Sequence, residues 1–221
     1  MSDTKPAEPE KPRRRQARGE RRMAQLLEAA ASVFCKVGYT SASTNAIARE
    51  AGVSPGTLYQ FFPNKEAIAV ELGERLSHQM HEAHSQVFTE ANASLPLPDM
   101  MDAIVDPLIE FNCRNPVFLA LIHSSDVPGK VVEEHDALHA ALLARVEGLI
   151  SVFAPGLPAD GRTRTAEMAF ALFTSGLELV LAHEGTERDA YAAELKAALL
   201  GYLGPRLDPD PASSQRSAAR S

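Results

Sequence analysis

Apolar residues recur every three to four positions along most of this chain, and no segment alternates with the period of two that marks a strand. Over residues 20–37 this spacing predicts an amphipathic helix, which Gly38 is placed to end as a C-cap glycine. A second helix is predicted to begin after Ser43. A third is predicted after Ser54, an N-cap residue that is followed by Pro55 at the first helical position.

A long helix is predicted from Lys65, and the remainder of the chain is predicted to be helical throughout. Proline and glycine residues separate the further helices, which are expected near residues 99–113, 116–124, 131–153, 162–184 and 188–203. The predicted fold class is therefore all-α, with about nine helices in total. A three-helix N-terminal domain would precede a C-terminal helical bundle.

Composition divides the 221 residues into four segments. Residues 1–19 are rich in Pro, Glu, Lys and Arg, which predicts a disordered basic arm. Residues 20–64 and 65–204 form the two predicted domains. The Pro/Ser/Ala-rich residues 205–221 are predicted to be a disordered tail.

Charge is distributed unevenly between the two ends of the chain. The formal net charge is −7, yet residues 1–70 contain 11 basic and 7 acidic side chains, whereas residues 71–221 contain 11 and 22. A basic N-terminal third indicates that this end meets a polyanion. The arginine-rich half of the arm is expected to touch phosphate or the minor groove of DNA, the alternative being a terminus that only aids solubility.

Residues 43–62 have the form of a helix-turn-helix, two short helices joined by a tight turn that contains glycine. Gly52 is expected to supply the positive φ of the turn. The second helix is too short to be stable alone, so it is displayed by a scaffold. Its outward positions carry small or hydrogen-bonding residues, which suits a helix that sits deep in the major groove: Pro55, Gly56, Thr57, Tyr59 and Gln60.

Three groups of residues in one register make the chain resemble the TetR family of transcriptional regulators. They are the sequences Ile-Ala-Arg-Glu-Ala-Gly-Val-Ser at 47–54, Gly-Thr-Leu-Tyr at 56–59 and Phe-Pro-Asn-Lys-Glu at 62–66. The resemblance covers about residues 20–75. It implies a sequence-specific DNA-binding regulator, a repressor that binds a palindromic operator as a homodimer and is released by a ligand.

The resemblance also implies functions for individual residues of the helix-turn-helix and of the helix after it. Thr44, Tyr59 and Lys65 are expected to bind phosphates, and Asn45 is expected to reach a base or the backbone.

Base edges are expected to lie against Pro55, Gly56 and Thr57. Gln60 can pair bidentately with adenine. Gln60 and Phe61 depart from the aromatic–histidine pair common in the family, so which of the two faces DNA stays open.

A C-terminal domain that binds the ligand and dimerises is the remaining implication of the resemblance. The residues agree, because segment 165–182 is apolar nearly all round, and such a helix must be buried on two faces. Dimerisation through the last two helices is predicted, with burial inside one chain as the alternative. The predicted interface residues are Met168, Leu172, Gly176, Leu179, Leu195, Leu199 and Tyr202.

The ligand pocket is the feature that the sequence indicates least. Apolar side chains with few charges suit a small, mostly apolar organic effector, although each residue taken singly is also ordinary core. No other cofactor is expected. The candidate ligand-binding residues are Met101, Ile104, Phe111, Asn112, Phe118, His123, Phe170 and Phe173.

Histidine and cysteine residues offer alternative chemistry. His78, His81 and His84 are three residues apart on one helix, which would suit metal sensing, although solvated histidines are the expected alternative and no metal site is predicted. Cys113 as a redox sensor is a further alternative. No nucleophile, P-loop or dinucleotide motif is present, so no catalytic residue and no enzyme activity are expected.

Two points concern partners and location. No apolar run approaches the roughly 18 residues that span a bilayer, and two widely separated cysteines fit a reducing compartment. No membrane association and a cytoplasmic location are therefore expected, and the partners would be operator DNA, a second copy of the chain and the effector. The alternative function is a TetR-like module that binds a small molecule or a protein without binding an operator.

Overall fold

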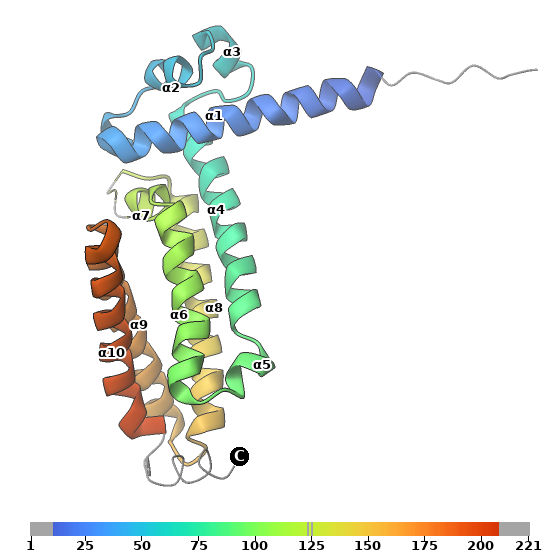
Figure 1. Ribbon diagram of the computed structural model, residues 1–221. Coiled ribbons are helices and arrows are strands. Elements are labelled where there is room, and N and C mark those ends of the chain that lie inside the picture. Colours follow the sequence, from blue (N-terminus) through green and yellow to red (C-terminus); the bar gives the residue numbers. More distant parts are fainter. Residues whose placement is uncertain (1–10, 123, 125, 208–221) are drawn as a thin grey trace, which may run out of the picture. The chain divides into compact units, whose positions relative to one another are not determined.

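Every regular element in the described part of the chain is an α-helix, which confirms the all-α prediction (Figure 1). The computed structural model describes residues 11–122, 124 and 126–207. The helices are α1 (Lys11–Ser41), α2 (Thr44–Glu50), α3 (Pro55–Tyr59), α4 (Lys65–Val87), α5 (Glu90–Ala93), α6 (Leu97–Arg114), α7 (Val117–Ile122), α8 (Gly129–Phe153), α9 (Ala159–Leu181) and α10 (Gly185–Leu207).

The described residues hold ten helices where about nine were predicted, and the additional one is α5. This helix is a single turn, N-capped by Thr89, whose hydroxyl accepts a hydrogen bond from the backbone N–H of Asn92 at 3.2 Å. A helix of four residues is too short to show an apolar period. Pattern analysis therefore cannot find it.

Disorder was the wrong prediction for residues 11–19, which form the first part of α1. Lys, Arg, Gln and Ala are good helix formers, and a helix that already exists extends at low cost. The side-chain amide of Gln16 donates a hydrogen bond to Glu20 at 3.1 Å, an i,i+4 pair that supports the extension. Residues 1–10 of the predicted arm and 208–221 of the predicted tail lie outside the described residues, whereas residues 205–207 complete α10.

The described chain folds into two compact units. The first unit contains the residues up to Glu74 together with Leu119–Val131, and the second contains Arg75–Phe118 and the residues from Val132 onward. The sequence predicted a boundary at residue 65 and no return of the chain. Contacts of the returning segment explain the difference, since Thr40 donates a hydrogen bond to Asp126 at 2.9 Å and Lys130 pairs with Glu74.

The first unit has a small apolar core that carries α2 and α3. On α1 the side chains of Leu27, Ala30 and Phe34 are spaced three and four residues apart and are at most 2% exposed. Ile47 of α2 and Leu58 of α3 are fully buried, as the pattern predicts for their inner faces. The two short helices are therefore fixed by tertiary packing, because neither would persist alone.

In the second unit α6, α8, α9 and α10 surround an apolar interior (Figure 1). Helices α9 and α10 are packed so closely that a Cβ atom on Gly176 would overlap the side chain of Leu195. Leu195 is 5% exposed and cannot move outward freely. A Cβ atom at position 176 would therefore force the buried Leu195 side chain to shift.

Substitution of Gly176 by alanine should lower the free energy of unfolding by about 1–3 kcal/mol, the usual range for overpacking. The matched control is Gly201→Ala in α10, where a Cβ atom meets nothing within 4 Å. There the better helix propensity of alanine should raise stability by up to about 1 kcal/mol. Urea unfolding of both variants checks the prediction, and a stabilised Gly176→Ala variant would contradict it.

Candidate functional site

The helix-turn-helix of the first unit is built by local chemistry that the sequence predicted. The Ser43 hydroxyl accepts a hydrogen bond from the backbone N–H of Ala46 at 3.2 Å, and that of Ser54 accepts one from Thr57 at 3.1 Å. Pro55 follows as the first residue of α3, and Gly52 adopts a φ of 64° in the turn. Both N-caps and the glycine turn are thus confirmed.

α3 presents a polar, uncharged face to its surroundings. Pro55, Gly56 and Gln60 are exposed, and Tyr59 is 52% exposed although it is a large aromatic residue. Thr57 is half-buried, and its hydroxyl lies 3.0 Å from that of Ser54. An exposed tyrosine on a short helix of small residues has no packing function, so this face is available to a partner.

Thr44 and Tyr59 lie together although they come from different helices. The Thr44 hydroxyl of α2 and the Tyr59 hydroxyl of α3 are 3.0 Å apart. The resemblance implied that each of them binds a phosphate. Their proximity means that the two hydroxyls can serve one oxyanion together, with neighbouring Asn45 exposed beside them.

Lys65 has a role that sequence analysis missed. Its ammonium group donates hydrogen bonds to the backbone carbonyls of Tyr39 at 2.9 Å and Thr40 at 3.1 Å. It also lies 4.4 Å from the centre of the Tyr39 ring, a cation–π distance. Gly38 interrupts α1 here with a φ of 77°, and the helix ends at Ser41, so its last carbonyls are open to a side-chain donor. The Tyr39 carbonyl also accepts a hydrogen bond from the backbone N–H of Ala42 at 3.2 Å. Two of the three N–H donors of Lys65 are therefore used inside the protein.

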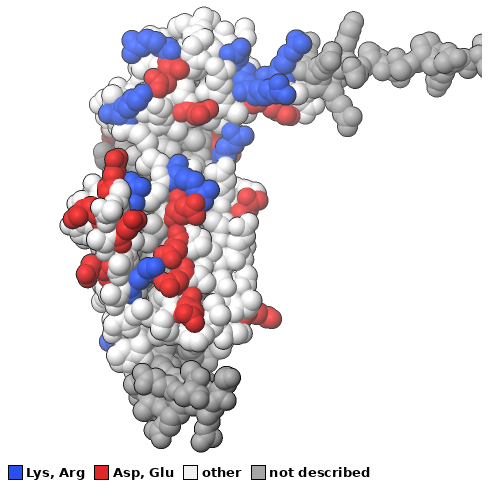
Figure 2. All heavy atoms as spheres, viewed as in Figure 1, with Lys and Arg blue, Asp and Glu red and all other residues white. Residues whose placement is uncertain are grey.

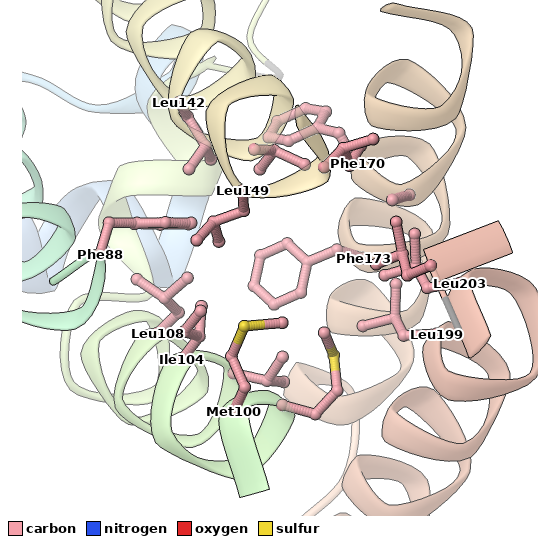
Figure 3. A pocket seen from close by; sticks show the side chains of 16 residues that line it. Phe88, Met100, Ile104, Leu108, Leu142, Leu149, Phe170, Phe173, Leu199 and Leu203 are labelled. Atoms are coloured by element: carbon pink, nitrogen blue, oxygen red, sulfur yellow. The ribbon is translucent and has the colours of Figure 1, made fainter. Parts of the chain in front are cut away.

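An apolar cavity of about 80 Å³ lies among the helices of the second unit (Figure 3). No polar side chain lines it. Phe173 reaches from α9 toward the middle of the cavity. The lining residues are Phe88, Met100, Met101, Ile104, Val105, Leu108, Leu142, Val146, Leu149, Ile150, Ala169, Phe170, Phe173, Leu199, Leu203 and Leu207.

Half of the predicted ligand-binding residues line this cavity. These four are Met101, Ile104, Phe170 and Phe173. Phe111, Asn112 and Phe118 do not line it, and His123 lies outside the described residues.

The reason for the misplacement is clearest at Asn112. Its side chain is 3% exposed and donates its amide hydrogen bond to the Leu108 carbonyl of the same helix at 2.8 Å.

The sequence missed the α10 contribution of Leu203 and Leu207, because leucines at helical spacing carry no signal that separates a cavity wall from ordinary core.

An apolar surface on α9 agrees with only part of the predicted dimer interface. Met168 and Leu179 are 49% and 52% exposed, and Leu172 is half-buried on the same helix. Leu195 and Leu199 were misplaced, since both are buried inside the second unit and Leu199 lines the cavity. A helix with two apolar faces does not reveal from sequence which face meets its own chain.

The remaining predicted interface residues divide in the same way. Gly176 faces Leu195 of its own chain, whereas Tyr202 is half-buried, with the guanidinium group of Arg206 4.0 Å from its ring centre.

The histidines of α4 differ sharply in environment. His78 is exposed and lies 3.7 Å from Glu82, whereas His84 is 4% exposed. Burial, together with the positive charges of Arg145 and His81, lowers the pKa of His84 to about 4. Among the described residues no group of three or more potential ligands gathers to hold a metal ion.

The cysteine thiols and the apolar character of the helices complete the description of the site. Cys35 is exposed and Cys113 half-buried, and both are free thiols. Within the described ranges, no helix combines the length and apolar character needed to cross a membrane.

Comparison with known proteins links both units to one family. Residues 26–72 match the model of the tetR family of bacterial regulatory proteins, and residues 96–203 match that of the tetracycline repressor-like C-terminal domain. The chain is 42% identical over 48 residues to the fatty acid metabolism regulator protein of Bacillus subtilis, which is 22% of this chain and 25% of that protein. It is 39% identical over 88 residues to the A-factor receptor protein of Streptomyces griseus, 40% of this chain and 29% of that protein.

These matches span less than a third of the length of either curated relative. The structural similarity covers more of the chain than these sequence matches do. The crystal structure of the transcriptional regulator FadR from Bacillus subtilis in complex with stearoyl-CoA superposes with a TM-score of 0.60 at 19% identity, over 80% of this chain and 96% of that one. With the helix-turn-helix geometry, the two family matches and this shared fold in agreement, the chain belongs to the TetR family of bacterial transcriptional regulators.

Proposed function

We propose that this chain is a ligand-released transcriptional repressor that binds a palindromic operator as a homodimer. The main support for the proposal is the polar face of α3, which contains the half-exposed Tyr59. The fully buried Leu58 anchors this helix on the core of the first unit. A regulator of this kind acts on chromosomal DNA in the cytoplasm, and we assign the chain no catalytic role.

The proposed reading geometry places α3 in the major groove. Pro55 and Gly56 lack bulky side chains, so the N-terminal turn of α3 can approach base edges closely. Thr57 and Gln60 would contact bases there, and Gln60 has the amide that pairs bidentately with adenine. The hydroxyl pair of Thr44 and Tyr59 would hold one phosphate.

The apolar surface on α9 supports a two-fold dimer. Met168, Leu172 and Leu179 recur at helical spacing, and the first and last are about half exposed, which is costly for large apolar side chains in water. A second copy of the same helix would cover them, with Tyr202 of α10 at the edge. The two helix-turn-helix motifs of such a dimer would contact half-sites that lie one turn of the DNA helix apart, roughly 34–36 Å.

The effector that the cavity supports best is a compound with a long apolar chain. The wall offers no hydrogen-bonding side chain, so a polar group would be buried at a cost of several kcal/mol. A likeness of fold to a regulator in complex with stearoyl-CoA supports an acyl group as this chain. The effector would release DNA only if it binds the non-operator geometry of the dimer more tightly than the operator-bound geometry.

Selection from a random-sequence duplex pool tests the proposal. Purified protein should enrich a sequence with two inverted half-sites, and it should bind that duplex at least about 1,000-fold more tightly than a shuffled duplex. If no sequence is enriched, the repressor proposal fails. The alternative function, a TetR-like module that binds a small molecule or protein without an operator, would then stand.

Two substitutions, one in α3 and one directly after it, should separate phosphate binding from base recognition. Tyr59→Phe removes one hydroxyl donor, so affinity for all duplexes should fall by about tenfold. Gln60→Ala should instead reduce preference at one base pair, worth about 1–3 kcal/mol, and leave binding to the shuffled duplex unchanged. The matched control is Tyr191→Phe in α10. A uniform loss of affinity in Gln60→Ala would show that this side chain reads no base.

A further inference from the structure

An open groove separates the N-terminal part of α1 from α3 in the first unit. Its volume is about 470 Å³, and one wall contains Thr57 of α3 together with Gln60 and Phe61, which directly follow this helix. The α1 wall is formed by Arg18, Gly19, Arg21, Arg22 and Gln25, spaced so that they share one helical face. Figure 2 shows basic side chains gathered over this part of α1. The groove therefore has one strongly basic wall and one wall formed by the recognition helix.

The three arginines have no ion-pair partner among the described residues. Arg22 donates a hydrogen bond to the amide oxygen of Gln25 at 3.0 Å, which leaves its charge uncompensated. Gln25 in turn donates to the carbonyl of Ala51 at 2.7 Å, so this side chain is tied to the end of α2. The arginine face is thereby connected to the helix-turn-helix by a specific contact.

Three lysines of the first unit have partners within it. Lys36 is paired with Glu50 at 2.8 Å, Lys130 with Glu74, and Lys65 with two backbone carbonyls. α3 itself contains neither Lys nor Arg. A DNA reader draws most of its affinity from cations that neutralise phosphates. The cations that line the groove beside α3 are the arginines of α1.

We propose that the groove between α1 and α3 binds the sugar–phosphate backbone of one operator strand. The guanidinium groups of Arg18, Arg21 and Arg22 would hold successive phosphates, because their planar donors match phosphate oxygens bidentately. Gln60 and Thr57 on the opposite wall would then reach the bases of the adjoining major groove. The inference rests on the proposed operator binding, and it assigns the affinity to α1 and the sequence preference to α3.

The salt dependence of DNA binding tests whether α1 provides affinity and α3 provides sequence preference. The probes are the duplex enriched by the wild-type protein and a shuffled duplex of the same length. Replacement of all three arginines by alanine should weaken binding to both duplexes alike, by at least about 100-fold near 0.1 M salt. The slope of log K against log salt should decrease by about 2.7, since each lost phosphate contact removes about 0.9.

Two further variants make the result specific. The triple arginine-to-lysine variant keeps the charges and should recover most of the slope. Lys36→Ala removes one charge from the same helix outside the groove and should leave the slope unchanged, whereas Arg21→Ala should lower it by about 0.9. Circular dichroism of each variant establishes that α1 is still folded, and Arg21→Ala serves if the triple variant is not.

The outcomes are distinguishable. If the wild-type protein enriches and binds no duplex, the repressor proposal itself fails. If it binds but the arginine variants keep its affinity and slope, the groove does not bind backbone and this inference is overturned. Loss of binding to the enriched duplex alone would also overturn it, because it would mean that the arginines read bases.

Discussion

Replacing Phe173 with tryptophan should abolish the stabilisation of this protein by the proposed effector with a long acyl chain. Phe173 reaches toward the middle of a cavity of about 80 Å³ (Figure 3). That volume holds only a few methylene groups, whereas sites for drug-sized ligands measure about 300–1,000 Å³. The proposed acyl chain would therefore have to displace Phe173, helped by the adaptable side chains of Met100 and Met101. A larger indole at position 173 would fill the space that the chain needs.

The opposite substitution should have the opposite effect on ligand binding. Phe173→Ala should lower the free energy of unfolding by about 3 kcal/mol, since it removes a large side chain from a packed interior. The enlarged cavity should accept the acyl chain without displacement of a ring, so ligand affinity should rise. Saturating ligand at about 100 times Kd should then restore about 2.7 kcal/mol.

Urea unfolding with and without stearoyl-CoA as the probe measures both effects. Phe111→Trp is the matched control, because Phe111 is an aromatic residue of α6 that does not line the cavity. It should respond to the probe as the wild-type protein does. Equal stabilisation of the wild-type protein and Phe173→Trp would mean that the effector binds elsewhere.

Acid should destabilise this protein through His84, with up to about 3 kcal/mol lost between pH 7 and pH 4. Burial, with smaller contributions from the charges of Arg145 and His81, lowers the pKa of His84 to about 4 in the folded state, against 6.5 in the unfolded chain. Between these values the unfolded chain binds the proton and the folded chain does not. Stability from this group is therefore complete above about pH 6.5 and is lost as the pH falls toward 4.

Substitution of His84 by glutamine should remove this part of the pH dependence. The free energy of unfolding of His84→Gln should fall less steeply than that of the wild-type protein between pH 7 and pH 4. His78→Gln is the control on the same helix, since His78 is exposed and should leave the slope unchanged. Unfolding titrations at several pH values check the prediction, and parallel curves for the wild-type protein and His84→Gln would contradict it.

Local chemistry explains why so much of the DNA-binding head could be predicted. Ser43 and Ser54 act as N-caps and Gly52 takes a positive φ because those functions belong to the residue types themselves. The inward positions Ile47 and Leu58 followed from helical spacing alone. None of these features needs knowledge of a distant part of the chain.

Features that depend on a partner across the fold were predicted less well. Leu195 and Leu199 are apolar at helical spacing, which is equally suited to a dimer surface or to the interior. The hydrogen bonds of Lys65 inside the protein were missed because the carbonyls that accept them belong to residues 25 and 26 positions away. The extension of α1 through residues 11–19 was missed because composition cannot distinguish an exposed charged helix from a disordered arm.

The sequence by itself determined the all-α class, the helix-turn-helix and the polarity of its reading face, because periodicity, capping and turn chemistry act within a few residues. The tertiary structure decided which faces of α9 and α10 are interior, which residues enclose the cavity, and which cations remain beside α3. Those properties depend on side chains brought together from distant positions, and burial or neutralisation exists only after they meet.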